Sequence, residues 1–506
     1  MVKSENKFSS LFLKYLRKNP NKILIIDEKS NTEFSWNDCY KIMQRIEKFF
    51  EKNKLRAGDT IISGLPNCIE NLFIFLTCMT CGYNYAALPE QFSYYEKKKL
   101  QKIVKPKLIF LNKIITTKNK SGEIKINLDS KFLWLPEIKK KKSFSSYASK
   151  IFILSSGTTG KPKVIVQNIN NLILNGHDFL ENHKFVNAET VFLNYLSMSY
   201  LGGLYNLLIL PLIANASVVV TASFSGITFL NIWKIIERFK INCLWLVPSI
   251  IKGILKIHSK NSFQIKEKIN RYLKYSFVGT APLSDKEKKK FEEKFGILLL
   301  ENYGLSETLF ITSENLKSDK NYGSRSTGFL LKKVKLRFEK YNNKFQRILV
   351  NTPSLFEGYL DEEGMLIRNL DYNGYFSTGD LGYKKLNKLI LAGREKDIIK
   401  KGGFLVNLRE IELITSNIED VYEVAAIKID DEFYGETSIV FFSSKKKISP
   451  KDKEKIEFEI FEKITSSFAK QKWPKKVVYI NELPKTRSGK ISKFKLKQVY
   501  EKSITK

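Results

Sequence analysis

Cysteine and histidine are scarce in this sequence, with five cysteines and three histidines in 506 residues. Cysteines so few and so unevenly spaced exclude a disulfide framework and favour a reducing compartment. Cys78 and Cys81 have the spacing of a redox or metal motif, but no second pair accompanies them and an apolar run, Leu72–Thr77, precedes them. We therefore expect both thiols to be buried in a helix rather than to bind a metal.

No segment is typical of a secretion signal or a membrane span. The first residues, Met1–Lys7, include a glutamate and lead to no apolar core of a signal peptide. The one long uncharged run, Leu201–Gly226, is interrupted by Asn206, Pro211 and Asn215. We expect this run to form a buried helix followed by a buried strand, in a cytoplasmic protein without a transmembrane segment.

Acidic residues are outnumbered, since 86 lysines and arginines face 52 aspartates and glutamates, which gives a formal net charge of +34. Such a charge ordinarily indicates a nucleic acid or an anionic membrane as partner. Here lysine far outnumbers arginine and is spread along the whole chain beside abundant isoleucine and asparagine, as a genome rich in A and T would produce. We therefore expect no specific nucleic-acid partner and only weak, nonspecific binding of anions.

The sequence does contain a loop suited to phosphate. The apolar run Ile151–Leu154 predicts a strand that leads into a segment of small, hydroxyl-bearing and lysine residues. Glycines let backbone N–H groups turn toward an anion, while the hydroxyls donate hydrogen bonds and the lysines add charge. It is not a Walker loop, because Pro162 follows Lys161 and a serine replaces the first glycine; a polar surface turn is the alternative. The candidate phosphate-binding residues are Ser155, Ser156, Gly157, Thr158, Thr159, Gly160, Lys161 and Lys163.

Four further motifs follow in order: Asn302–Glu307, Tyr375–Asp380, Gly393–Asp397 and Pro484–Lys490. Together with the loop, this ordered set resembles the adenylate-forming superfamily of acyl-CoA synthetases, adenylation domains of nonribosomal peptide synthetases and beetle luciferases. The resemblance covers most of the chain, from the landmark Leu65–Asn67 onward. It implies an enzyme that uses ATP to activate a carboxylic acid as an acyl-adenylate and releases pyrophosphate.

The residues of these motifs suit that chemistry. Joining a carboxylate to the α-phosphate of ATP brings two anions together, so the site must neutralise charge and hold Mg²⁺. Glu307 offers an oxygen ligand for Mg²⁺, and Ser306 beside it can donate to a phosphate. Asp380 suits the ribose hydroxyls, and Arg394 can donate to the ribose or a phosphate in a fixed fork. Taken singly, each also fits an ordinary role, such as a turn residue or a surface ion pair.

Other candidate residues surround the adenine. Tyr303 offers a flat face for the base, and Asn302 precedes it in the same motif. The resemblance implies that Gly279, Thr280 and Ala281 line the other side of the base.

The final motif ends in Lys490, after a flexible and hydroxyl-bearing loop, Thr486–Gly489. In so lysine-rich a chain the default role of a lysine is surface charge, but the resemblance implies that Lys490 is the catalytic lysine, which bridges carboxylate and α-phosphate. Ile398–Gly403 resembles acyl-CoA synthetases, in which a hinge rotation brings this glycine face, with Gly403, to the thioester site. CoA is the implied acceptor, and a free-standing acyl carrier protein is the alternative.

The substrate class rests on fewer residues. Tyr195–Gly203 resembles the superfamily segment that places an aromatic residue or histidine, here Tyr200, beside the carboxylate. No aspartate near it would bind an amino group, which favours a plain carboxylic acid. Two departures from the superfamily pattern stand out, Val164 where glycine commonly follows the loop and Gln346–Arg347 in place of Gly-Glu.

Short apolar runs alternate with helix-like stretches along the chain, which is typical of sheets covered by helices. We predict an α/β fold with a large N-terminal domain over residues 1–395 and a small, mobile α+β C-terminal domain over 396–506, joined by a hinge near Lys396. A noncatalytic protein that binds nucleotides or anions on this fold is the alternative from another functional class. The runs expected to be strands are Ile23–Ile26, Thr60–Ile62, Leu108–Leu111, Val218–Val220 and Leu244–Val247.

Overall fold

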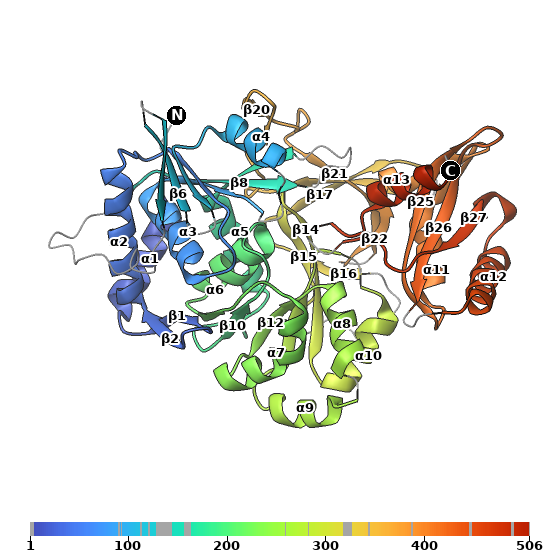
Figure 1. Cartoon of the computed structure of the whole chain (residues 1–506), viewed down its shortest axis with the longest axis horizontal. Coiled ribbons are helices and arrows are strands. Elements are labelled where there is room, and N and C mark those ends of the chain that lie inside the picture. The colour runs from blue at the N-terminus through green and yellow to red at the C-terminus, as the bar shows by residue number, and fades with distance from the viewer. Residues whose placement is uncertain are drawn as a thin grey trace.

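The protein consists of a large body and a smaller C-terminal body (Figure 1), seen here in a computed structural model. The residues that the structure describes are 5–89, 92, 94–111, 114–119, 122–127, 144–155, 163–258, 260–281, 283–316, 326–342, 345–385, 388–444, 448–486 and 490–504. Most of the phosphate loop, residues 156–162, lies outside these residues, and so do the side chain of Ser155 and residues 487–489 before Lys490.

The largest sheet has thirteen strands within the described residues, in the order β17-β18-β21-β22-β16-β15-β14-β13-β12-β10-β11-β1-β2. Strands β1 and β10 to β14 pair in parallel, whereas the strands beyond β14 pair antiparallel. The strands are β1 (Ile23–Asp27), β2 (Thr32–Ser35), β10 (Val191–Asn194), β11 (Ser217–Val220), β12 (Cys243–Leu246), β13 (Tyr275–Val278), β14 (Leu298–Leu305), β15 (Leu309–Ser313), β16 (Ser326–Leu330), β17 (Lys335–Lys340), β18 (Gln346–Asn351), β21 (Phe376–Lys385) and β22 (Lys388–Arg394).

A second sheet of nine described strands lies beside the first, in the order β20-β19-β9-β8-β4-β3-β5-β6-β7. Its strands are β3 (Thr60–Ser63), β4 (Asn84–Ala87), β5 (Leu108–Leu111), β6 (Ile114–Asn119), β7 (Gly122–Asn127), β8 (Lys150–Ser155), β9 (Lys163–Asn168), β19 (Gly358–Leu360) and β20 (Leu366–Ile367). The five apolar runs expected to be strands form parts of β1, β3, β5, β11 and β12, apart from Val247, which follows β12, and this confirms the prediction.

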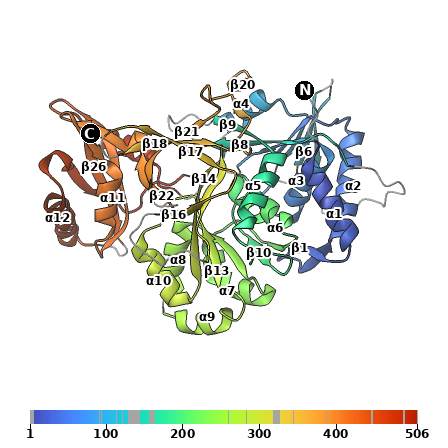
Figure 2. The same cartoon turned by 180° about the vertical axis from the view of Figure 1, so that it is seen from behind.

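Helices cover the sheets of the large body, and α1 contacts α2, α3 and α5 (Figure 2). Every residue of α3 from Asn71 to Cys81 is buried, because the helix is apolar on all sides and must be enclosed. The helices are α1 (Lys7–Lys18), α2 (Trp36–Lys52), α3 (Ile69–Cys81), α4 (Tyr94–Val104), α5 (Ile169–Glu181), the π-helix η2 (Gly202–Ile209), α6 (Leu210–Ile213), α7 (Gly226–Phe239), α8 (Pro248–His258), α9 (Ser262–Ile269) and α10 (Asp285–Phe295).

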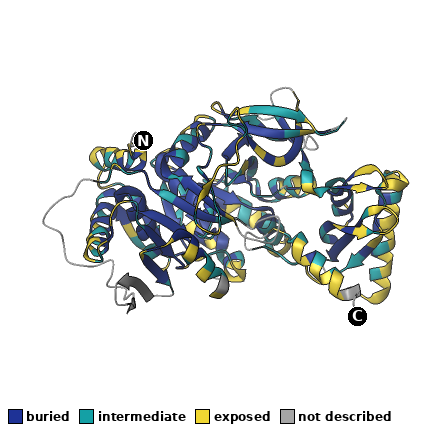
Figure 3. Cartoon of the chain, turned by 90° about the horizontal axis from the view of Figure 1, so that it is seen from above, coloured by how far each residue is buried: buried dark blue, intermediate teal, exposed yellow. Residues whose placement is uncertain are grey.

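The smaller body is built on a third sheet with the order β24-β23-β26-β25, and β27 pairs with β26. Separate groups of buried apolar side chains pack around this sheet. Exposed residues lie on the outside of the smaller body (Figure 3). The elements are η3 (Glu395–Asp397), β23 (Ile398–Lys401), β24 (Phe404–Asn407), α11 (Leu408–Ser416), β25 (Val421–Asp431), β26 (Gly435–Ser444), α12 (Pro450–Ser467), η4 (Lys470–Lys472), β27 (Lys476–Tyr479) and α13 (Lys493–Ile504). The predicted α/β fold with a smaller α+β part is confirmed, while the boundary at 395/396 stays a prediction.

The predictions for the cysteines and for the long uncharged run are also confirmed. All five cysteines are free, and Cys78 and Cys81 are buried in α3 as expected. The run Leu201–Gly226 forms η2, α6 and then β11. No helix within the described residues is long and apolar enough to cross a membrane, whereas the cytoplasmic location stays a prediction.

Candidate active site

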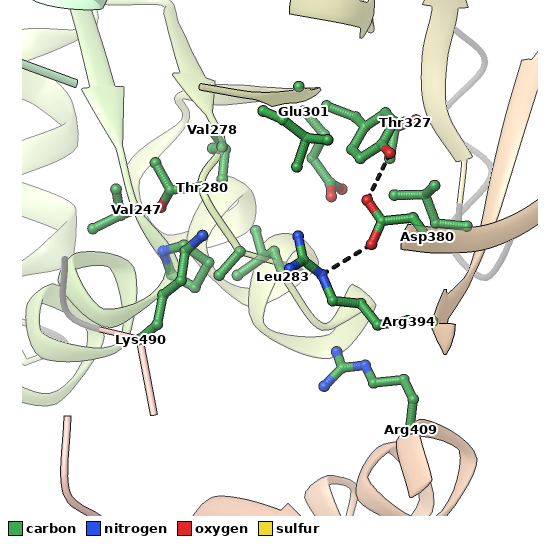
Figure 4. A pocket seen from close by; sticks show the side chains of 18 of the residues that line it. Val247, Val278, Thr280, Leu283, Glu301, Thr327, Asp380, Arg394, Arg409 and Lys490 are labelled. Atoms are coloured by element: carbon green, nitrogen blue, oxygen red, sulfur yellow. Dashed lines mark hydrogen bonds and ion pairs between the residues drawn. The ribbon is translucent and has the colours of Figure 1, made fainter. Parts of the chain in front are cut away.

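A cavity of about 2260 Å³ lies where the large body faces the smaller one. The parallel strands β12 and β13 end at its wall, with Val247 and Gly279 directly after them. Crevices beyond the carboxyl ends of parallel strands are common ligand sites, because loops there diverge and leave room. Lys490 and Arg409 reach the same cavity from the C-terminal body (Figure 4).

The cavity brings together most of the predicted site residues that the structure describes. Gly403 does not line it, and lies at the turn between β23 and β24. The predicted residues that line the cavity are Lys163, Tyr200, Gly279, Thr280, Ala281, Asn302, Tyr303, Ser306, Glu307, Asp380, Arg394 and Lys490.

Asp380 is the centre of a buried polar group. Its Oδ2 accepts a hydrogen bond of 2.7 Å from the Tyr303 hydroxyl. Its Oδ1 lies 2.9 Å from Nε of Arg394 (Figure 4). The pairing of β21 with β22 places Asp380 directly opposite Arg394. Burial raises the pKa of Asp380, and the neighbouring guanidinium opposes that rise. Gly379, within β21 where its register with β18 shifts, has φ of 70°, a backbone conformation that favours glycine.

The structure shows that Tyr303 and Arg394 both contact Asp380, which the sequence did not indicate. Tyr303, predicted as a flat face for adenine, is 8% exposed and also holds the Asp380 carboxylate through its hydroxyl. Arg394 is an ion-pair partner of Asp380, but it lies in the cavity and not on the outer surface. Each oxygen of the Asp380 carboxylate has a further lone pair with which it could accept a ribose hydroxyl. Binding of ribose by Asp380 stays a prediction.

Glu307 lies in the turn between β14 and β15, which other strands hold in place. The Tyr359 hydroxyl donates to its Oε1 at 2.8 Å, and Nε2 of Gln167 donates to the Ser306 carbonyl at 2.7 Å. Nζ of Lys163 lies 5.0 Å from the centre of the Tyr359 ring. Sequence reasoning missed Tyr359, since only the antiparallel pairing of β19 with β9 brings it to this turn.

The donors present fit Mg²⁺ bound together with ATP. Among the described residues, no group of three or more histidine, cysteine, aspartate or glutamate side chains could hold a metal ion. Magnesium usually keeps several waters and combines one or two carboxylates with phosphate oxygens, so a single protein carboxylate at Glu307 is sufficient.

Lys490 enters the cavity from a short segment that the fold anchors on both sides. The N–H of Thr486 donates to the Lys490 carbonyl at 2.6 Å. Three residues after Lys490, Nζ of the Lys493 side chain lies 3.1 Å from Asp397 and 2.8 Å from Glu412. These contacts tie the lysine to the hinge region and to α11.

The Lys490 ammonium lies in a positive and partly desolvating environment. The side chain keeps contact with solvent because the cavity is open, yet the surrounding protein lowers its pKa to about 8. Arg394 adds to that effect by repulsion, while Asp380 and Glu307 oppose it by attraction.

We expect formation of the adenylate to depend on the protonated form of Lys490. Its rate should then fall as the pH rises through about 8, because the ammonium that the resemblance places between carboxylate and α-phosphate loses its proton. The measurement is the pH profile of pyrophosphate release. In Lys490→Arg the decline of the residual rate should move to higher pH, since a guanidinium stays charged. An unmoved decline would show that another group titrates.

A second charged cluster at the cavity wall was also missed. Nζ of Lys288 lies 3.0 Å from Glu301 and 2.7 Å from Glu314. Burial raises the pKa of Glu301, and the lysine between the two carboxylates limits that rise. The three residues lie on α10, on β14 and after β15, so no local motif in the sequence marks them.

Comparison with known proteins agrees with this arrangement. The AMP-binding enzyme family matches residues 12–360, and the AMP-binding enzyme C-terminal domain matches residues 410–490. The predicted boundary at 395/396 falls between the two matches.

Two relatives and one solved structure illustrate the similarity. The chain is 22% identical over 505 residues to 4-coumarate--CoA ligase 1 of Arabidopsis thaliana, covering 92% of this chain and 88% of that protein. It is 27% identical over 361 residues to the sulfoacetate--CoA ligase of Cupriavidus necator, covering 69% of this chain and 67% of that protein. The fold matches that of ATP-bound MatB from Rhodopseudomonas palustris with a TM-score of 0.84 at 21% identity, covering 99% of this chain and 100% of that one. Because the family match spans more than half of its residues, the chain belongs to the AMP-binding enzyme family, the adenylate-forming superfamily that includes the acyl-CoA synthetases.

Proposed function

We propose that this protein activates a carboxylic acid with ATP to form an acyl-adenylate and pyrophosphate, and then transfers the acyl group to CoA. The observation that carries the proposal is the meeting of Lys490 with Glu307, Asp380 and Arg394 in one cavity, although these residues are far apart in the sequence. Their charges are those needed to bring a carboxylate and a triphosphate together.

Four side chains of the cavity would act in the first step. The Lys490 ammonium lies between the two bodies and would bridge the acid carboxylate and the α-phosphate, where negative charge must be held at close range. Arg394, oriented by Asp380, would donate to the ribose or the α-phosphate. Glu307, with one oxygen held by Tyr359, would hold Mg²⁺, which when bound would neutralise the phosphate charge. No proton needs to leave the acid, because a carboxylate is already ionised at neutral pH.

Transfer to CoA would need a second arrangement of the C-terminal body. Gly403 lies outside the cavity, with φ of 84° and no atom within 4 Å of the position where a Cβ would stand. Its predicted role at the thioester site therefore requires rotation about the hinge near Lys396. The CoA-ligase relatives favour CoA over a carrier protein as the acceptor.

One departure from the superfamily pattern lies beside this hinge. Arg347 replaces the usual glutamate and makes hydrogen bonds of 2.7, 3.1 and 3.2 Å to Glu395, the residue before Lys396. A paired guanidinium and carboxylate would hold the N-terminal side of the hinge to β18.

Lys396→Pro should slow thioester formation more than adenylate formation. Proline fixes φ near the value of the present η3 turn and so removes the backbone freedom that a rotation would use. The two steps would be timed in separate single-turnover experiments. Lys396→Ala is the matched control, because it removes the same side chain and leaves the backbone free. Equal losses in both steps would contradict the hinge at this residue.

A screen for pyrophosphate release over a panel of carboxylic acids, with and without CoA, tests the proposed function. Release with an acid and identification of the acyl-CoA product would support both half-reactions. Pyrophosphate release that yields a free acyl-adenylate and no CoA thioester would favour a carrier protein as acceptor. ATP binding without release for any acid would favour the noncatalytic alternative.

A further inference from the structure

The inner end of the cavity contains a buried polar side chain that the first step does not use. Asn206 is 7% exposed, lies in the otherwise apolar π-helix η2 and lines the cavity. Its side-chain amide hydrogen-bonds to no residue that the structure describes. The amide is open to the cavity, so an acyl group bound there would displace water from it and would have to replace its hydrogen bonds. Short π-helical segments frequently occur at functional sites.

A nearby asparagine, Asn175, differs from Asn206 in that residues of the fold pair with its amide. Asn175 donates from Nδ2 to the Phe310 carbonyl at 2.9 Å, and its Oδ1 accepts from the Tyr205 hydroxyl and the Phe310 N–H at 2.9 and 3.0 Å. These bonds satisfy Asn175 within the fold. Asn206 is the next residue after Tyr205, yet its own amide has no comparable partner among the described residues.

The position of Asn206 connects it to the predicted carboxylate-binding end. Gly202 precedes it by four residues, close to one helical turn, and both line the cavity. A Cβ on Gly202 would stand 2.4 Å from the Tyr200 ring, so glycine is needed for Tyr200 to fold against the start of η2. Tyr200 and Asn206 therefore belong to the same end of the cavity.

Aromatic side chains wall off this end. The Phe310 ring stacks on Tyr205 and on Trp245, with both centroid distances 5.2 Å. All three side chains are 7% exposed or less. The three rings form a close-packed part of the cavity wall.

A second hydrogen-bond donor belongs to the same wall. The indole nitrogen of Trp245 is buried and has no partner among the residues described. It lies 3.6 Å from the position where a Cβ on Gly279 would stand. Buried indole N–H groups usually find a partner.

We propose that this end of the cavity selects a carboxylic acid whose acyl group carries a hydrogen-bonding oxygen, with Asn206 as the specificity-determining residue and Trp245 as a second donor. The inference rests on the proposed acid-activating function and names its substrate class. A purely hydrocarbon acyl group would leave both polar groups unpaired, whereas an oxygen would satisfy them.

The test compares acids of nearly equal shape that differ in one oxygen. Suitable pairs are 4-acetylbenzoate with 4-isopropylbenzoate, and 4-oxopentanoate with 4-methylpentanoate. The measurement is kcat/KM for pyrophosphate release by the wild type and by Asn206→Leu. We expect the wild type to prefer the oxygenated acid by about tenfold or more in at least one pair, and Asn206→Leu to reduce that ratio to near one.

Tryptophan variants provide a matched comparison. Trp233 also has a buried indole nitrogen without a described partner, but it stacks on Phe295 and does not line the cavity. Trp245→Phe should lower the preference for the oxygenated acid, and Trp233→Phe should leave it unchanged, although both changes remove the same N–H. Thermal unfolding of each variant reports whether its fold is retained, and Asn206→Asp replaces the leucine variant if that one unfolds.

The outcomes separate this inference from the proposed function. Pyrophosphate release without preference for the oxygenated acid of either pair, or a preference that Asn206→Leu leaves intact, would overturn the inference and leave acid activation standing. If no acid is converted, the proposed function fails, and the pairs are then compared by the thermal stabilisation that each acid produces with ATP. Equal stabilisation within each pair would overturn the inference as well.

Discussion

Replacement of Lys490 by alanine should reduce adenylate formation by about 10²-fold or more, because removal of one preorganised charge contact at a developing anion has effects of this size. The ammonium lies in a cavity with Arg394, Asp380 and Glu307, and its segment is anchored to α11 through Lys493. ATP should still bind, since the other residues proposed to contact phosphate and ribose belong to the large body. The measurements are single-turnover pyrophosphate release and equilibrium binding of ATP.

A matched lysine separates catalysis from the general positive charge. Lys495 is exposed on α13 and does not line the cavity, so Lys495→Ala removes the same charge nearby without touching the site. It should leave the rate nearly unchanged. Pyrophosphate release by Lys490→Ala at a rate close to that of Lys495→Ala would eliminate Lys490 as the catalytic lysine.

The second large effect is expected at Glu307. Glu307→Gln keeps the shape and can still accept the Tyr359 hydrogen bond through its amide oxygen, but it removes the charge that would attract the metal. The magnesium concentration for half-maximal pyrophosphate release should rise about tenfold or more, since loss of even an outer contact of a metal ligand weakens metal affinity by 10- to 100-fold. At saturating magnesium part of the activity should return.

Two further variants serve as controls for the magnesium titration of Glu307→Gln. Glu363→Gln makes the same change at an exposed position outside the cavity and should leave the magnesium titration where it is. Tyr359→Phe removes the hydroxyl that orients Glu307 and should shift the titration less than Glu307→Gln does. A titration that is the same in wild type and Glu307→Gln would remove Glu307 from the proposed metal site.

Local patterns in the sequence were sufficient for several strands, and its motifs pointed to twelve of the residues that line the cavity. The apolar runs that became β1, β3, β5, β11 and β12 are short and bounded, so hydrophobic burial alone indicates strands. Glu307, Asp380 and Lys490 were found because each lies in a motif that resembles the adenylate-forming superfamily. The family match confirms the superfamily that these motifs indicated, whereas the roles of the individual residues stay predictions.

Contacts between distant segments were decided only by the tertiary structure. Tyr359 meets Glu307 through the pairing of β19 with β9, and Lys288 meets Glu301 and Glu314 through the packing of α10 against β14 and the end of β15. Asn206 could be read in the sequence only as an interruption of an apolar run. Whether such a polar side chain is satisfied, as Asn175 is, or left facing a cavity depends on which backbone groups the fold brings within hydrogen-bond distance. The sequence therefore determined the family and the chemistry of its motifs, while the fold decided which polar groups have partners and which are left to bind a substrate.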